Sequence, residues 1–403
     1  MITRRELLAA AARLAPALPC ASLALPLLRG EAIAKDRLAE ILSAAPVARY
    51  WTSVARAGSD CAPCHGANTH AGGRRPPHDP RLVRCLLCSH ACSIPPGERG
   101  RCRARMNVDG RLRSLVYGRP LAVHLDPIEK KPFYHFLPGA AALSLGTAGC
   151  PFRCRFCQNW EISQARPEDH AAAYVPPGEV VAAAASRKAP VVAFTYNEAT
   201  VFTEYFTDIA REGRGRGLRS VLVSCGFMRE EPLREMCEVL HAIKIDLKGY
   251  SPVFYRNVCG AELAPVLRSI RQVAKRGVHL EIVNLVVPTL NDTGTMLREL
   301  ADWVVGEAGP DIPVHFTRFH PDYQLRNLPP TPVATLERAR EVGMARGLRF
   351  AYVGNVPGHP GNHTYCPGCG KVVIGRKGFF VVENHLAQGR CRFCRRAIPG
   401  VWS

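Results

Sequence analysis

Residues 143–157 read LSLGTAGCPFRCRFC, a short apolar run followed by three cysteines in the pattern C-x3-C-x2-C. The run at 143–149 predicts a buried strand, which places Cys150, Cys154 and Cys157 in the loop after that strand. Three thiolates at this spacing can bind three irons of a [4Fe–4S] cluster and leave the fourth iron without a protein ligand. Because Gln158 and Asn159 are poor zinc ligands, the pattern favours a cluster with one open, catalytic position.

Further apolar runs recur along the chain, separated by segments of helical length. The runs span 191–196, 221–226, 242–248, 280–287, 314–319 and 349–354. The helical segments span 201–217, 230–240, 262–277, 293–308 and 332–346. This alternation predicts parallel strands with right-handed crossovers. Six or seven units are too few for a closed eight-stranded barrel, so we expect an α/β fold. It would be a partial (β/α)6-type TIM barrel at residues 136–358, with its chemistry at the carboxyl ends of the strands.

The composition is that of a globular protein and argues against two functional classes. The chain has 403 residues, of which 47% are hydrophobic, so it can bury a large core. Its formal net charge is +19, but the arginines are spread along the chain and no basic run is interleaved with aromatics. We therefore expect no nucleic-acid partner. Beyond the N-terminal stretch, no apolar run is long enough for a stable membrane span.

The first 80 residues carry two signals that concern targeting. Residues 1–34 have the pattern of a Tat-type signal, with twin arginines at Arg4 and Arg5, an apolar stretch from 7 to 28, and AIA at 32–34. The alternative is an N-terminal amphipathic helix that stays in the cytoplasm. Residues 35–80 are expected to be irregular and contain CAPCH, Cys61 to His65, which has the form of a haem c attachment motif.

Two further groups of cysteines have the spacing of metal ligands. The C-terminal region, 359–403, carries two C-x2-C pairs, which predict a zinc ribbon with the ligands Cys366, Cys369, Cys391 and Cys394; a rubredoxin-like iron site is the minority alternative. The Cys-rich N-terminal region, 81–135, carries a second candidate metal site formed by Cys85, Cys88, Cys92 and Cys102. This spacing does not decide between zinc and an auxiliary Fe–S cluster, and His90 could replace one thiol.

The three-cysteine loop, with Phe156 before its last thiol, resembles the motif of radical S-adenosylmethionine (SAM) enzymes. In those enzymes the open iron chelates SAM, and one electron cleaves the sulfonium to give methionine and a 5′-deoxyadenosyl radical that abstracts hydrogen from a substrate. A longer set of motifs resembles the radical SAM member of the AmmeMemoRadiSam system, which is similar to pyruvate formate-lyase activating enzymes. These motifs are CPFRCRFCQNWEIS, DPIEKKPFYHFLPG, FTYNEATVF, IDLKGYSPVFYR, RFHPDYQL, YVGNVPGH and IPGVW. The resemblance covers roughly residues 81–403.

The resemblance implies cofactor-binding residues at the ends of the second and third strands. Asn197 and Glu198 match the segment that holds the amino group of SAM in activating enzymes, where a carboxylate can pair with an ammonium. Ser224 keeps a hydroxyl where those enzymes have a Thr-Asn-Gly segment. Cys225, however, replaces the amide, which departs from the family pattern.

Three more cofactor-binding residues follow from later motifs. Asp246 and Lys248 stand two apart in IDLKG and therefore point to the same side of one strand. The resemblance makes them contacts of SAM or substrate, and a surface ion pair is the alternative. His320 in FHP resembles the histidine on the adenosine side of SAM, and a hydrogen-bonded core histidine is its alternative. No catalytic residue is assigned beyond the cluster.

Together these features predict a radical SAM oxidoreductase that is similar to glycyl-radical-activating enzymes. Its substrate would be a backbone glycine of a partner enzyme or a small molecule passed among AmmeMemoRadiSam partner proteins, and its reductant a protein such as flavodoxin or ferredoxin. A non-enzymatic Fe–S and haem electron-transfer protein is the alternative. Because SAM is cytoplasmic and haem c attachment is not, we expect cytoplasmic action without haem c, while the twin arginines leave export open.

Overall fold

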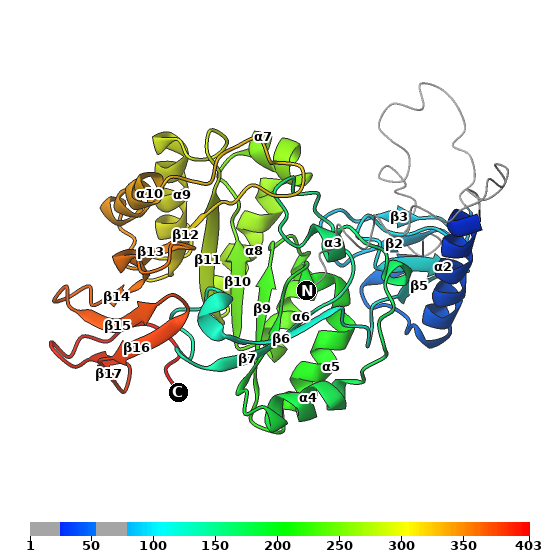
Figure 1. The fold of residues 1–403 in the computed structure, drawn as a ribbon, viewed down its shortest axis with the longest axis horizontal. Helices are drawn as coiled ribbons and strands as arrows, with labels where there is room; N and C mark the ends of the chain where they lie inside the picture. The colour runs from blue at the N-terminus through cyan, green and yellow to red at the C-terminus, as the bar shows by residue number, and fades with distance from the viewer. Residues whose placement is uncertain (1–24, 54–78) are drawn as a thin grey trace, which may run out of the picture.

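The computed structural model describes residues 25–53 and 79–403, and its centre is an eight-stranded sheet (Figure 1). The strands are β6 (Ala122–Pro127), β7 (Ala141–Gly146), β8 (Val191–Phe194), β9 (Arg219–Ser224), β10 (Ala242–Asp246), β11 (His279–Val286), β12 (Val314–Arg318) and β13 (Ala351–Gly354). They lie side by side in sequence order, so β6 and β13 form two free edges and the barrel is not closed. Strands β7 to β13 are parallel, and each predicted apolar run overlaps one of them. The predicted partial α/β barrel is confirmed.

Helices connect the parallel strands and pack around the sheet (Figure 1). They are α4 (Pro177–Ser186), α5 (Thr203–Arg214), α6 (Glu230–Val239), α8 (Leu263–Lys275), α9 (Gly294–Glu307) and α10 (Val333–Ala345), with the short α3 (Trp160–Ser163) and α7 (Pro252–Phe254). The amphipathic pattern is clear in α8, which buries Leu263, Val266, Ile270 and Val273 at helical spacing. The five predicted helices are present. Strand β6, which pairs antiparallel with β7, was not among the predicted strands.

The segment predicted to be irregular is partly ordered. Helix α2 (Leu25–Ala44) runs through the AIA motif, and β1 (Trp51–Ser53) pairs with β2 (Val83–Cys85), which pairs with β3 (Ser93–Ile94). The prediction was wrong for residues 35–44 and 51–53, because tertiary packing stabilises them: Ile41 is buried against Leu115. The twin arginines and the CAPCH motif lie outside the described residues.

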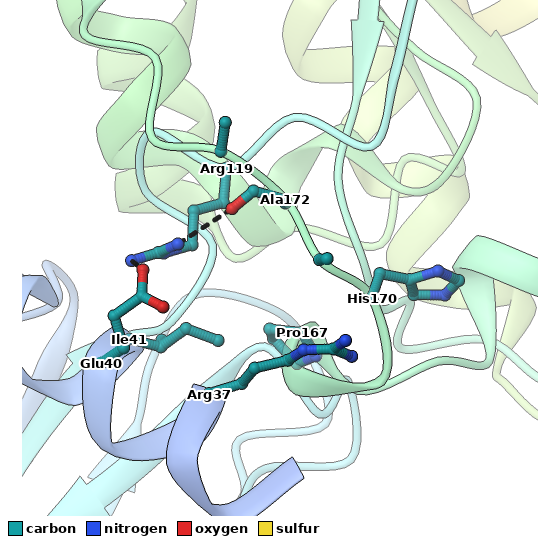
Figure 2. A pocket seen from close by; sticks show the side chains of 9 residues that line it. Arg37, Glu40, Ile41, Arg119, Pro167, His170 and Ala172 are labelled. Atoms are coloured by element: carbon teal, nitrogen blue, oxygen red, sulfur yellow. Dashed lines mark hydrogen bonds and ion pairs between the residues drawn. The ribbon is translucent and has the colours of Figure 1, made fainter. Parts of the chain in front are cut away.

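Helix α2 borders a pocket of about 260 Å³, whose other wall is the segment 167–173 (Figure 2). There the Arg119 guanidinium pairs with Glu40 at 3.1 Å and donates to the carbonyl oxygen of Ala172 at 3.0 Å. These contacts tie the helix to the loop that leads into the barrel. No helix of the described part of the chain is long and apolar enough to cross a bilayer.

The C-terminal region forms two small antiparallel sheets. One contains β14 (Thr364–Tyr365), β15 (Val372–Lys377) and β16 (Phe380–Asn384), and the other contains β17 (Leu386–Ala387) and β18 (Arg390–Cys391). A further hairpin, β4 (Arg105–Val108) and β5 (Arg111–Ser114), lies in the N-terminal region.

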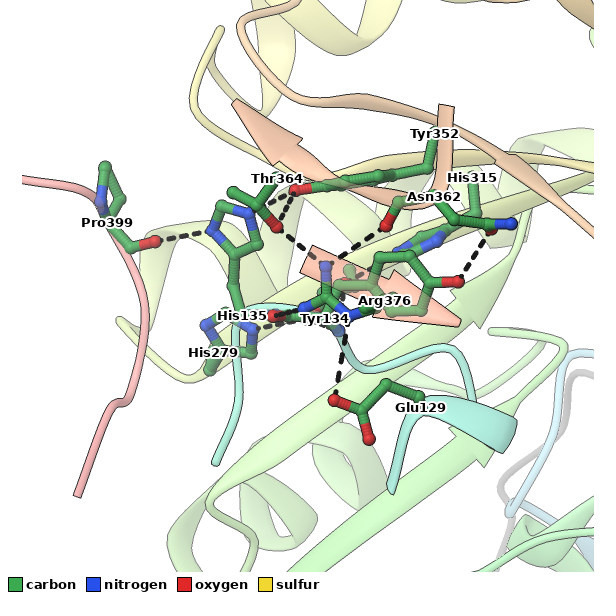
Figure 3. Close-up of polar contacts among 11 residues, drawn as sticks. Glu129, Tyr134, His135, His279, His315, Tyr352, Asn362, Thr364, Arg376 and Pro399 are labelled. Atoms are coloured by element: carbon green, nitrogen blue, oxygen red, sulfur yellow. Dashed lines mark hydrogen bonds and ion pairs between the residues drawn. The ribbon is translucent and has the colours of Figure 1, made fainter. Parts of the chain in front are cut away.

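A buried polar network joins the C-terminal region to the barrel (Figure 3). The fully buried Arg376 donates to the carbonyl oxygens of Tyr134 and Asn362, at 2.8 and 3.2 Å, and lies 3.7 Å from the Glu129 carboxylate. The last residues of the chain add backbone pairing, because Val401 accepts from Leu137 at 2.7 Å and donates to His135 at 2.8 Å. The motifs DPIEKKPFYHFLPG and IPGVW therefore meet at this junction.

Candidate active site

The three-cysteine loop begins directly after β7 and runs beneath the ends of the neighbouring strands. Cys150 and Cys154 are 7% exposed, and Cys157 is half-buried. The Asn197 side chain, at the end of β8, holds the start of the loop: it accepts from the Thr147 amide at 3.2 Å and donates to the Gly149 carbonyl oxygen at 2.8 Å. The amide of Asn197 is occupied by the loop, so its observed role is to position the cysteines.

Two further thiols touch the loop from the far side. The Cys150 thiol contacts the Cys225 thiol after β9, and the Cys154 thiol contacts Cys259, the last residue of the π-helical turn Tyr255–Cys259. Phe156 stacks on Phe254 at a ring distance of 6.3 Å, which keeps this side of the loop apolar. Three converging thiols in apolar, water-poor surroundings fit an Fe–S cluster, because such clusters are held by cysteine thiolates.

The C-terminal cysteines have a different geometry. The sulfur atoms of Cys366, Cys369, Cys391 and Cys394 all lie within 4.8 Å of one another, as ligands of a single ion must. Within residues 25–53 and 79–403, no other group of three or more histidine, cysteine or acidic side chains meets this limit. The four C-terminal cysteines predicted to bind one metal ion therefore lie together. The thiols of Cys150, Cys154 and Cys157 do not meet this limit and would suit a centre larger than a single ion.

Glu198 lies at the strand ends, and its carboxylate is held by several hydrogen bonds. Only 2% of its surface is exposed. Its Oε1 accepts from the Ser224 hydroxyl at 2.7 Å and from the Thr200 amide at 3.2 Å, and its Oε2 accepts from the Cys225 amide at 2.6 Å. A carboxylate has about four lone-pair sites, two on each oxygen. Oε2 uses one of these sites, so it can still accept a hydrogen bond from an ammonium group.

Asp246, at the end of β10, lies between two lysines. It pairs with Lys248 at 3.2 Å and with Lys244 on its own strand. Burial would raise the pKa of Asp246, but the two ammonium groups outweigh burial and hold that pKa below its usual value. Burial alone would lower the pKa of Lys248, and the Asp246 charge raises it well above its usual value instead. Asp246 and Lys248 therefore stay charged as an ion pair.

A second lysine-rich group contributes to the same cleft. Asp126, at the end of β6, pairs with Lys130 at 2.8 Å and Lys131 at 2.6 Å, and accepts from the Tyr196 hydroxyl at 2.9 Å. The Lys131 ammonium also lies 4.5 Å from the centre of the Tyr196 ring. Tyr196 has a φ of 71°, an uncommon conformation for a residue other than glycine and one that recurs at functional sites.

These groups line one cleft of about 390 Å³. It contains the predicted residues Asn197, Glu198, Ser224 and Asp246, and Lys248 lies beside it through Asp246. His320 follows β12, is exposed and does not line this cleft. The structure also adds Phe379, from the turn between β15 and β16 of the C-terminal region.

Sequence reasoning missed several polar residues of the cleft, among them Lys130, Lys131, Tyr196 and Lys244. Lys244 could have been found, because in IKIDLK it alternates with Asp246 and Lys248 and so points to the same side of the strand. Lys130 and Lys131 lie in DPIEKKP, before the first parallel strand, and only the pairing of β6 with β7 brings them to the cleft.

Comparison with known proteins agrees with this geometry. Residues 144–304, which include the cysteine loop and the cleft strands β8 to β10, match the Radical SAM superfamily. A protein of Methanocaldococcus jannaschii, the uncharacterized protein MJ0808, is 41% identical over 322 residues, which cover 79% of this chain and 96% of that protein.

Solved structures with a similar fold have low sequence identity. A domain of a pyruvate-formate lyase-activating enzyme from Bacteroides vulgatus is 17% identical and covers 41% of this chain and 98% of its own, with a TM-score of 0.37. A radical SAM methyltransferase from Sphaerobacter thermophilus is also 17% identical and covers 54% of this chain and 67% of its own, with a TM-score of 0.44. The superfamily match and the cysteine loop together identify the chain as a radical SAM enzyme, a member of a superfamily whose chemistry uses a [4Fe–4S] cluster, SAM and an external reductant.

Proposed function

We propose that Cys150, Cys154 and Cys157 hold the catalytic cluster and that SAM binds in the cleft above them, with its amino group on Glu198. The observation that carries this proposal is the position of Glu198. Its carboxylate is fixed by three neighbours, lines the cleft and keeps an acceptor site on Oε2. With both cofactors bound, one-electron cleavage of SAM supplies a 5′-deoxyadenosyl radical that abstracts hydrogen from the substrate.

The side chains around the cleft bind and orient the reactants. Ser224 holds the Glu198 carboxylate, and Asn197 holds the cysteine loop. Lys248 and Lys244 supply positive charge for the SAM carboxylate, while Asp246 keeps both ammonium groups in place. We assign His320 to the adenosine end of SAM on the resemblance alone, since it does not line the cleft.

The substrate and partners follow from the resemblance to activating enzymes. We propose hydrogen abstraction either from a backbone glycine of a partner enzyme or from a small molecule of the AmmeMemoRadiSam system, with a flavodoxin or ferredoxin as reductant. Lys130 and Lys131 also line the cleft and would favour an anionic substrate group. Because this chemistry needs SAM, we place it in the cytoplasm and expect no covalent haem at Cys61 and Cys64.

The direct test is anaerobic reconstitution with iron and sulfide, reduction with dithionite and addition of SAM. We expect 5′-deoxyadenosine and methionine to form, and SAM to change the EPR spectrum of the reduced cluster. Reconstituted protein that holds iron but neither binds nor cleaves SAM would contradict the proposal and favour an electron-transfer protein.

Replacing Glu198 with alanine should weaken SAM binding by about 10- to 100-fold, because a hydrogen bond between charged groups contributes about 1.5–3 kcal/mol. Iron content should not change, since Glu198 is not a cluster ligand. The matched control is Ser224→Ala, which removes one donor to Glu198 but keeps the carboxylate and should have a smaller effect. Titration of both reconstituted variants with SAM measures this, and equal affinity in Glu198→Ala and wild type would remove Glu198 from the site.

We also propose zinc as the metal of the C-terminal four-cysteine group. Cys369→Ser combined with Cys394→Ser should lose about one zinc per chain and lower the melting temperature, because a structural zinc contributes directly to folding. SAM cleavage at low temperature should persist. Cys237→Ser, in α6, is the control that changes a thiol outside every proposed site. Unchanged zinc content in the double variant would refute the assignment.

A further inference from the structure

Four thiols from separate segments of the N-terminal region line one small cavity. Cys85 ends β2, Cys88 and Cys92 lie between β2 and β3, and Cys102 precedes β4. The rest of the wall includes Leu87, Val201, Pro151 and Gly100. Four cysteine thiols, which are soft metal ligands, therefore line one apolar space. They come from a stretch of eighteen residues.

Gly100 keeps this space open. A Cβ atom at Gly100 would lie 3.9 Å from the sulfur atoms of both Cys92 and Cys102, and 3.3 Å from the Ile94 side chain. Any larger side chain would extend between the thiols. The cavity therefore depends on glycine at position 100, because glycine has no side chain.

The spacing of the thiols distinguishes this cavity from the C-terminal four-cysteine group. The C-terminal sulfur atoms all lie within 4.8 Å of one another, whereas the four N-terminal thiols do not form such a group, although all of them are among the described residues. The four N-terminal thiols line a common cavity and do not lie close enough together to meet the limit that the C-terminal group meets. A wider set of thiols around an apolar void suits a polynuclear centre better than a single ion, because inorganic sulfide and several irons must fit between them.

We propose that Cys85, Cys88, Cys92 and Cys102 bind a second [4Fe–4S] cluster, in which every iron has a protein ligand. Such a cluster has no open iron and therefore cannot chelate SAM. It is chemically distinct from the cluster proposed for Cys150, Cys154 and Cys157, which has three thiolates.

The two cysteine sites share a wall. Pro151, which follows Cys150, lines the N-terminal cavity, and its carbonyl oxygen accepts from Arg101 at 3.1 Å. Gly149 has a φ of 91°, and a Cβ there would overlap the carbonyl oxygen of Cys102. The backbones of the two loops are therefore in contact directly beside a proposed ligand of each cluster.

A second set of hydrogen bonds fixes this contact. Arg153 donates to the carbonyl oxygen of Cys150 at 2.8 Å and also to that of Arg101. His90 contacts the Pro151 carbonyl oxygen at 3.1 Å. Two reduced clusters held this close would have interacting electron spins, which gives a readout that does not depend on activity.

The test uses the full chain with Cys150, Cys154 and Cys157 all replaced by alanine. After anaerobic reconstitution we expect about four irons and four sulfides per chain to remain, with an EPR spectrum that SAM does not change. Adding Cys88→Ser and Cys102→Ser should remove this iron. Circular dichroism shows whether each variant is folded.

Wild type provides the second measurement, which does not require any variant to fold. It should bind about eight irons, and its reduced EPR spectrum should show spin coupling. Zinc instead of iron in the N-terminal site, or a wild-type total of about four irons with no iron left in the folded triple variant, would overturn the proposal. Because the triple variant lacks the SAM site, these outcomes are independent of whether wild type cleaves SAM.

Discussion

Replacing Cys154 with alanine is expected to abolish 5′-deoxyadenosine formation. Cys154 is the middle thiol of the loop after β7, and it is nearly fully buried. Without it, one iron of the proposed cluster has no anchor. Reconstituted protein should lose the iron and sulfide of that cluster, and single-turnover assays with dithionite and SAM should yield no product above background.

The sharpest control is the neighbouring thiol. Cys259 contacts Cys154 and is completely buried, but it is not part of the C-x3-C-x2-C pattern. Cys259→Ala should therefore retain the cluster and SAM cleavage, with at most the cost of a small core truncation. Product formation by Cys154→Ala, or equal losses in both variants, would show that the loop thiols are not the ligands we assign.

Replacing Glu281 with glutamine is expected to destabilise the protein by about 1–3 kcal/mol, the usual cost of leaving a buried hydrogen-bonding group unsatisfied. Glu281 lies in β11 with no exposed surface. Its carboxylate accepts from the amides of Tyr134 and His135, at 2.9 and 2.8 Å, and contacts His315 at 2.7 Å. A glutamine side chain has only one acceptor oxygen. It would leave some of the groups that now donate to Glu281 without an acceptor, and it would place its own NH2 group against other donors.

The effect can be measured by denaturant unfolding of the variant and wild type. Asp302→Asn is the matched control, because Asp302 pairs with Arg346 on the surface, and exposed pairs contribute at most about 1 kcal/mol. A change below about 1 kcal/mol for Glu281→Gln would show that the junction between barrel and C-terminal region does not depend on this charge.

The pH dependence of stability should follow from the same residue. Burial would raise the pKa of Glu281, but hydrogen bonds from His279 and His315 outweigh burial and hold that pKa far below its usual value. A carboxyl group with a lowered folded pKa contributes stability above its unfolded pKa, about 4.3, and loses that contribution as the pH falls further. Acid should therefore destabilise wild type more than Glu281→Gln between pH 5 and 2, roughly the interval over which such a carboxylate titrates.

A buried histidine adds acid sensitivity at higher pH. Burial lowers the pKa of His135 to about 3, while an unfolded histidine titrates near about 6.5. Below about pH 6.5 the unfolded chain therefore binds more protons than the folded one, and folding stability falls. His135 contacts the Pro399 carbonyl oxygen at 2.7 Å, so this loss also concerns the docking of the chain's last residues.

Local spacing was sufficient to predict the parallel strands, the helices between them and the cysteine loop. The apolar runs, the amphipathic helices and C-x3-C-x2-C are patterns within a few residues, and each has a direct physical reading in burial or ligand geometry. The C-terminal C-x2-C pairs also predicted a metal site, because two such pairs can bind one ion. In the structure their four sulfur atoms do lie together. Helix α2 was missed because it is stabilised by contacts between residues far apart in sequence, such as Ile41 with Leu115. A local sequence pattern does not show such contacts.

Only the tertiary structure decided which polar groups share the cleft. Lys131 and Glu198 lie far apart in sequence, and they line the same cleft because β6 and β8 both pair with β7. The same holds for the two cysteine loops, where Gly149 packs against the carbonyl oxygen of Cys102. Spacing along the chain specifies what one loop can bind, whereas the order of strands in a sheet decides which loops become neighbours. For this reason the sequence predicted each cysteine group as a candidate metal site, whereas the contact between two of these groups could not be predicted from it.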